Sequence, residues 1–250
     1  MMNIGAASSS NQPMSRLVFL AALVLVPVAT ADAQPAKKTG GVKGTVIFEG
    51  EPPERKTLRR DSDPYCQKTA KLAEDVVVTK GKLKDVIVRV KNGTAGKHAA
   101  PTAPVVIDQR ECMYTPRVVG LVAGQKIQVR NSDGTFHNVH GTLRGKLLWN
   151  KAQGAKAPDL ALETGAVADD VVDVVCDVHP WMHAYAVVQD HPFFAVSGED
   201  GTFEIKGLAP GSYELEAWHP TLGSRKLKIK IGTGAKSVVP ARISYKASDQ

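Results

Sequence analysis

The chain has 250 residues, a formal net charge of +7 at pH 7 and three cysteines. This length allows one or two small hydrophobic cores. The basic residues are scattered, and no nucleic-acid-binding motif, zinc-protease motif or phosphate loop accompanies them, so we expect no nucleic-acid partner and none of those enzyme classes.

Residues 1–33 have the features of a secretory signal peptide. Arg16 precedes an apolar run from Leu17 to Val28, and Ala31 and Ala33 form a small-residue cleavage motif. The run is short for a membrane span, and polar residues soon follow it. We therefore expect a periplasmic or secreted protein with no integral membrane span in the mature chain. A retained signal anchor is the alternative.

The chain after residue 33 predicts a linker at 34–41 and then an all-β fold. Short β-branched runs alternate with turn residues at the spacing typical of a β-sandwich or barrel. Helical periodicity is nearly absent, with room for one helical turn at residues 68–75. The predicted strands cover residues 42–48, 75–79, 86–90, 105–108, 118–122, 125–130, 171–175 and 184–188.

A polar turn at residues 131–134 leads into two histidines, His137 and His140. They are three residues apart, so alternation along a strand places their side chains on opposite faces. The polar segment 141–165 follows, and we expect it to cover part of any site built on these histidines. Trp149 within it is expected to pack in the core rather than over the site.

The predicted strand at 171–175 ends in a loop that carries three potential metal ligands. Cys176, His179 and Met182 offer a thiolate, an imidazole and a thioether. A fourth ligand from His137 or His140 would complete the two-His, one-Cys, weak-Met set of a blue-copper electron-transfer site. A buried Cys alone is more often a small core hydrophobe, so the combination carries the prediction.

The loop and the histidine stretch together resemble the cupredoxins, with an amicyanin- or plastocyanin-like ligand loop. The resemblance implies a Greek-key β-sandwich that holds one type 1 copper ion. It assigns His137, Cys176, His179 and Met182 as the ligands.

The same resemblance implies further roles around the ligands. Asn138 would tie the two ligand stretches together, and electrons would leave through an exposed edge of His179. Pro180 and Trp181 would form an apolar docking rim for a redox protein partner. His140 and His183 stay outside the ligand set, with a second, weaker metal site as their alternative role.

Cys66 and Cys112 remain once Cys176 is assigned to copper. An oxidising compartment allows them to form a disulfide, which would stabilise the chain by roughly 3–4 kcal/mol. Two alternatives stay open. The two thiols can remain separate, or one can pair with Cys176, which would abolish the copper site.

Residues 192–250 predict a second, small β-sandwich. Asp200-Gly201 is a hairpin turn signal. The segment resembles the carboxypeptidase regulatory-like, transthyretin-like sandwich, which serves as a structural or binding module without catalytic residues. We expect a cupredoxin-like domain at 42–191 and this domain at 192–250, unless the latter shares strands such as 42–48. The alternating apolar positions are Phe203, Ile205, Tyr213, Leu215 and Ala217.

We therefore expect a non-enzymatic carrier of single electrons. One alternative is a protein that binds or delivers copper without redox cycling. Another is a metal-free β-sandwich that binds glycan or protein. An oxidase or nitrite reductase would need a second copper site, and the seven histidines do not form the His-x-His pairs that such sites use.

Overall fold

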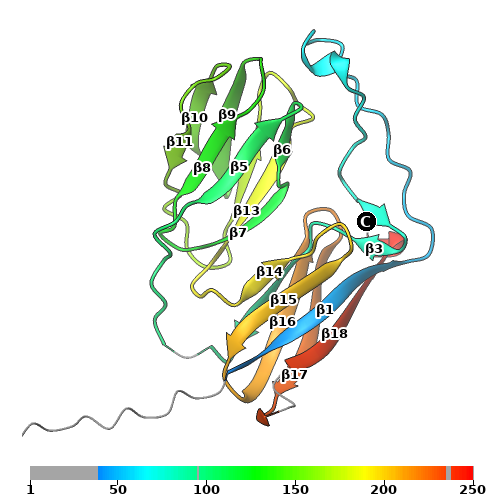
Figure 1. Cartoon of the computed structure of the whole chain (residues 1–250), viewed down its shortest axis with the longest axis vertical. Coiled ribbons are helices and arrows are strands. Elements are labelled where there is room, and N and C mark those ends of the chain that lie inside the picture. The colour runs from blue at the N-terminus through cyan, green and yellow to red at the C-terminus, as the bar shows by residue number, and fades with distance from the viewer. Residues whose placement is uncertain (1–38, 95, 235–237, 250) are drawn as a thin grey trace, which may run out of the picture. The chain divides into compact units, whose positions relative to one another are not determined.

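The computed structural model describes residues 39–94, 96–234 and 238–249, and their strands confirm the predicted all-β class (Figure 1). The predicted signal peptide and residues 34–38 of the predicted linker lie outside these ranges. Within them, the helical segments are the 3-10 turns η1 (Cys66–Lys68) and η3 (Ala247–Asp249). The helical turn expected at 68–75 is wrong, because it forms earlier, where the Asp63 carboxylate accepts the N–H groups of Tyr65 and Cys66.

The strands from β5 to β13 form a sandwich, here termed the central sandwich. One sheet has the order β10-β9-β12-β13-β7 and the other β11-β8-β5-β6. Side chains from both sheets, including Ile107 and Val172, are fully buried in one apolar cluster. The strands are β5 (Val105–Arg110), β6 (Met113–Thr115), β7 (Val118–Val122), β8 (Ile127–Asn131), β9 (His137–Leu143), β10 (Lys146–Gln153), β11 (Leu160–Leu162), β12 (Val171–Val175) and β13 (His183–Gln189).

The remaining strands form the terminal sandwich, which combines both ends of the described chain. One sheet has the order β15-β1-β3-β2, with β18 also paired to β1, and the other has the order β14-β4-β16-β17. Val46, Leu83 and Leu215 are among its fully buried core residues. The strands are β1 (Gly40–Glu49), β2 (Val78–Thr79), β3 (Lys82–Leu83), β4 (Ile87–Asn92), β14 (Phe194–Val196), β15 (Thr202–Leu208), β16 (Gly211–His219), β17 (Gly223–Ile231) and β18 (Val238–Lys246).

The strand pairing differs from the expected division at residue 191. β4 and most of β1 lie within the 42–191 range, yet β1 pairs with β15 and β18, and β4 pairs with β14 and β16. The chain therefore leaves the terminal sandwich after β4 and returns to it at β14. Gly40 and Gly41, expected in the linker, begin β1. A Cβ atom on Gly41 would lie 2.3 Å from the Ile205 carbonyl oxygen, so this close pairing needs glycine.

The polar segment 141–165 forms the end of β9 together with β10 and β11. Trp149 is 7% exposed and belongs to the central core, as predicted. A Cβ atom on Gly141 would lie only 2.4 Å from the Trp149 ring. The small residue on β9 thus makes room for the large one on β10.

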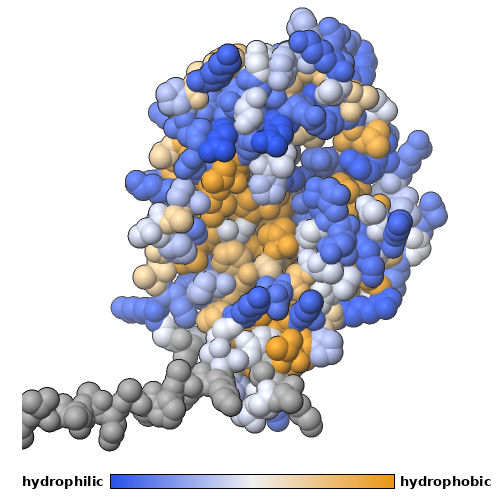
Figure 2. Space-filling view, viewed as in Figure 1, coloured by the Kyte–Doolittle hydropathy of each residue, from blue (hydrophilic) through white to orange (hydrophobic). Residues whose placement is uncertain are grey.

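Apolar side chains also gather around β7 and β14, on the face seen in Figure 2. Ile87, Val118 and Val187 form a small buried cluster there, and the ring of Phe194 packs over Gly120. In the described ranges, no helix has the length and apolar character needed to cross a membrane.

A long connection between β1 and β2 leaves the terminal sandwich altogether. Its outer part, residues 57–72, is here termed the cap segment. A β-bridge between Thr57 and Leu72 closes its base, and η1 lies within it. The cap segment reaches the end of the central sandwich at which β9 begins and β12 ends.

Candidate metal centre

The loop between β12 and β13 places two of the predicted ligands, Cys176 and His179, beside the start of β9. The Met182 N–H donates to the His179 carbonyl oxygen at 2.8 Å, and the Cys176 N–H donates to the Met182 carbonyl oxygen at 3.3 Å. This tight turn brings a ligand atom of Cys176 and one of His179 within 4.8 Å of one on His137. All three residues are buried.

Each imidazole is oriented by a carboxylate. His137 Nε2 lies 2.9 Å from Asp133 Oδ2, and His179 Nε2 lies 3.0 Å from Asp63 Oδ2. Burial acts to raise the pKa values of both carboxyl groups, but hydrogen bonds outweigh it, so the pKa of Asp133 is lowered and that of Asp63 falls to about 2. Ionised carboxylates only accept hydrogen bonds. Both Nε2 atoms therefore carry protons.

This assignment leaves both Nδ1 atoms as the potential metal ligands. They face each other at 2.9 Å. In neutral rings with Nε2 protonated, each Nδ1 carries a lone pair, and two lone pairs at this distance repel unless a cation or a proton lies between them. The pKa of His137 is raised, because Asp133 and Cys176 outweigh the lowering effect of burial. A cation held between the two Nδ1 atoms would remove this repulsion.

The sulfur of Cys176 lies in surroundings that favour the thiolate. Burial acts to raise the pKa of Cys176, but the neighbouring His137 side chain and backbone hydrogen bonds at Asn138, Val178 and His179 outweigh it and lower the pKa below its usual value. The sulfur lies 3.8 Å from His179 Nδ1. Thiolate and imidazole together suit copper.

Asn138 joins the two ligand stretches, as the resemblance implied. Its Oδ1 accepts the Asp177 N–H at 2.7 Å and lies 3.4 Å from the Cys176 sulfur, and its Nδ2 donates to Asp177 Oδ2 at 2.7 Å. Met182, the predicted axial ligand, is completely buried in the central core. Its backbone closes the ligand loop, as described above.

His140 and His183 lie apart from this cluster. Both are paired across the sheet with Val175, so they share the outward face. His140 Nδ1 lies 2.7 Å from Asp177 Oδ1, and His183 Nε2 contacts Asp173. In the described part of the chain, neither belongs to a group of three convergent ligand residues.

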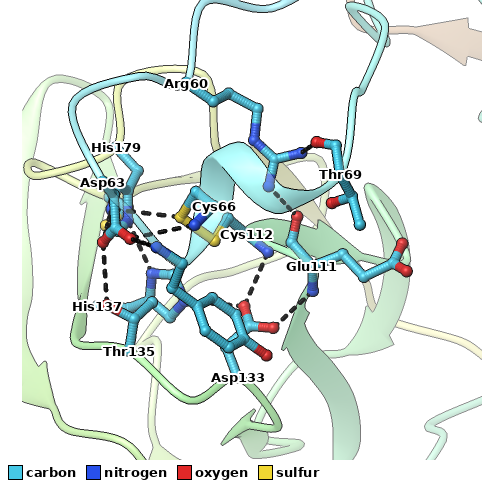
Figure 3. The surroundings of a disulfide bond; sticks show 12 residues. Arg60, Asp63, Cys66, Thr69, Glu111, Cys112, Asp133, Thr135, His137 and His179 are labelled. Carbon is cyan, nitrogen blue, oxygen red and sulfur yellow. Dashed lines mark hydrogen bonds and ion pairs between the residues drawn. A yellow bond between two sulfur atoms is a disulfide. The ribbon is translucent and has the colours of Figure 1, made fainter.

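The predicted disulfide between Cys66 and Cys112 is confirmed, with a Cα–Cα distance of 5.7 Å, and Cys176 keeps a free thiol. Figure 3 shows Asp63 and His179 beside this disulfide. The Cys66 sulfur lies 3.6 Å from His179 Nε2.

The expected exposed edge of His179 is wrong, because the cap segment covers it. The His179 side chain is only 3% exposed, and its Nε2 is taken by Asp63. Of the expected docking rim, Pro180 is exposed, whereas Trp181 is half-buried and donates its Nε1–H to the Cys112 carbonyl oxygen at 2.9 Å. Phe136 and Val178, each next to a histidine of the cluster, are 46% and 47% exposed.

Sequence reasoning missed both carboxylates. Asp133 carried a usable signal, since it lies four residues before His137 in a turn that leads into a strand. Asp63 lies 116 residues before its partner, and its only signal was its position three residues before a cysteine expected in a disulfide.

No protein-family model and no curated protein matches the chain. Among solved structures, a purple cupredoxin from Nitrosopumilus maritimus is 18% identical with a TM-score of 0.30, over 34% of this chain and 99% of its own. Amicyanin from Paracoccus versutus is 20% identical with a TM-score of 0.31, over 41% and 97%. A copper-containing nitrite reductase from Thermus scotoductus SA-01 is 14% identical with a TM-score of 0.32, over 40% and 25%. These likenesses are partial, and we base the functional proposal on the side chains described above.

Proposed function

We propose that this chain is an exported, cupredoxin-like electron carrier that holds one type 1 copper ion through His137, Cys176, His179 and Met182. The observation that carries the proposal is the convergence of two imidazole Nδ1 atoms and a thiol of lowered pKa in a buried site. When bound there, copper would supply one-electron chemistry. The chain would exchange electrons with a redox protein partner and would not be an enzyme.

The protein's own residues support this role in three ways. Asp133 and Asp63 hold the Nε2 protons, so each Nδ1 lone pair points into the site. The backbone hydrogen bonds of the ligand loop hold Cys176 close to His179. Burial excludes water. Fixed ligand positions limit the rearrangement that accompanies each electron transfer.

The test is the visible absorption spectrum of the protein after addition of Cu(II) and removal of the excess. We expect an intense thiolate-to-copper band that bleaches on reduction. Cys176→Ser should lose the band, whereas Met182→Gln should keep the copper and change the reduction potential. A Cys176→Ser protein that binds copper with the full blue colour would overturn the ligand assignment.

A second candidate is a protein that holds or delivers copper without redox cycling. The covered edge of His179 favours it, because that edge is then unavailable to a partner. A colourless protein that retains copper and forms no stable Cu(II) state would support this candidate. A protein that retains no copper would instead support a metal-free binding module.

A further inference from the structure

The cap segment is fastened to the central sandwich at several points beside the proposed copper site. The Cys66–Cys112 disulfide joins it to the turn between β5 and β6. Arg60 donates to the carbonyl oxygens of Thr69 within the cap segment and of Glu111 in that turn. The same guanidinium lies 5.8 Å from the ring centre of Trp181. These contacts fix the cap segment over the ligand loop.

Asp63 and Cys66 of the cap segment both contact the proposed ligand His179, and Asp63 brings a carboxylate to it. Its Oδ1 accepts the backbone N–H groups of Tyr65 at 2.7 Å and Cys66 at 3.1 Å. Its Oδ2 accepts the Thr135 hydroxyl at 2.9 Å and lies 3.0 Å from His179 Nε2. Because one oxygen is used by the turn, the other is left to define the proton position on His179.

We propose that Asp63 is a positioning residue for the copper ligand His179, delivered by the disulfide-fastened cap segment. It keeps the proton of the neutral imidazole on Nε2 and so leaves Nδ1 free to bind the metal. The cap segment also seals the Nε2 edge from solvent. The inference rests on the proposed function for the identity of the metal. The proton position and the covered edge do not depend on which metal binds.

This role can be separated from a structural one by changing the hydrogen-bond polarity without changing the shape. In Asp63→Asn, the side-chain oxygen can still accept the N–H groups of Tyr65 and Cys66, so η1 is retained. The amide NH₂ then takes the place of Oδ2 and faces His179 Nε2 as a donor. The His179 imidazole then accepts this hydrogen bond with a lone pair on Nε2, and its proton moves to Nδ1. Asp61→Asn, at an exposed position of the cap segment, is the matched control.

The experiment is ¹⁵N NMR of the histidine rings in the metal-free full chain, followed by titration with Zn²⁺, a redox-inactive and diamagnetic probe. We expect the Nε2–H tautomer at His179 in the wild type and in Asp61→Asn, and the Nδ1–H tautomer in Asp63→Asn. Zn²⁺ affinity should fall by about 10- to 100-fold in Asp63→Asn, as is typical when the partner of a ligating histidine is altered. It should be unchanged in Asp61→Asn.

A wild-type His179 with its proton on Nδ1 would overturn the proposal, and this reading needs no variant to fold. An unchanged tautomer together with unchanged Zn²⁺ affinity in a folded Asp63→Asn protein would also overturn it. Failure of the copper proposal looks different. In that case the blue band is missing from the copper-loaded wild type, while the His179 tautomer still responds to Asp63→Asn.

Discussion

The two sandwiches share an architecture and differ in how they treat buried polar groups. In the terminal sandwich, His219 Nδ1 accepts two backbone N–H groups, and Arg89 is held by Glu216. In the central sandwich, His137 and His179 turn their Nδ1 atoms toward each other and toward a thiol. Buried polar atoms normally find a partner within the protein. The difference shows that a ligand site can be recognised by buried polar atoms that the fold turns toward one another instead of pairing with the backbone or with an opposite charge.

The comparison also shows that the sandwiches are not independent modules. The cap segment belongs to the β1–β2 connection of the terminal sandwich, yet its disulfide and Asp63 lie at the proposed metal centre of the central sandwich. Changes in the cap segment should therefore alter both stability and metal binding. Changes in the terminal core should alter stability alone.

Removal of the disulfide should have the largest effect. The Cys66→Ser/Cys112→Ser double variant should lose about 4 kcal/mol of unfolding free energy in the chain-entropy model, since the bridge closes a long loop. It should also bind Zn²⁺ more weakly, because Asp63 is no longer fixed against His179. Urea unfolding with and without Zn²⁺ measures both effects. A stability loss with unchanged Zn²⁺ affinity would show that the cap segment stays closed without its disulfide.

A cavity made by substitution in the core of the terminal sandwich should have the second-largest effect on stability. Leu215 is fully buried on β16, so Leu215→Ala should cost about 3 kcal/mol of unfolding free energy. The copper spectrum and Zn²⁺ affinity should not change. Leu147→Ala, at a side chain that is 63% exposed, is the control and should cost little. If Leu215→Ala weakened metal binding as much as the loss of the disulfide does, the proposed division of roles would be wrong.

Asp85 should produce the smallest effect, with a pH signature. It is 3% exposed, and burial, partly offset by Lys84, raises its pKa to about 6. The folded pKa lies above the ordinary aspartate value of 3.8, so the stability that depends on this group is fully present below about pH 4 and is lost as the pH rises through about 6.

Asp85→Asn should therefore stabilise the protein at pH 8 by about 2 kcal/mol and give little gain at pH 4. The backbone there has φ 63°, which asparagine tolerates. The gain falls short of the full pKa shift because a buried amide also needs partners. Thermal unfolding at the two pH values measures it, with Asp61→Asn as an exposed control. An equal gain at both pH values would attribute the effect to the backbone instead of the charge.

Local patterns in the sequence determined the strands and the ligand loop. Period-2 alternation and turn residues are local signals, and the predicted strands 118–122 and 171–175 coincide with β7 and β12. The spacing of Cys176, His179 and Met182 is short enough that one turn sets their geometry. The disulfide could be predicted because Cys66 and Cys112 were the two cysteines that remained once Cys176 was assigned to the metal.

The tertiary structure alone decided which strands share a sheet and what surrounds the ligands. The parallel pairing of β1 with β18 joins the two ends of the described chain, and side-chain alternation does not specify such a partner. Asp63 meets His179 across 116 residues, through a connection whose composition indicates only a loop. The sequence by itself therefore determined the ligand residues of the proposed copper site. The fold decided their proton positions and their cover, because both depend on contacts between segments that are distant in the chain.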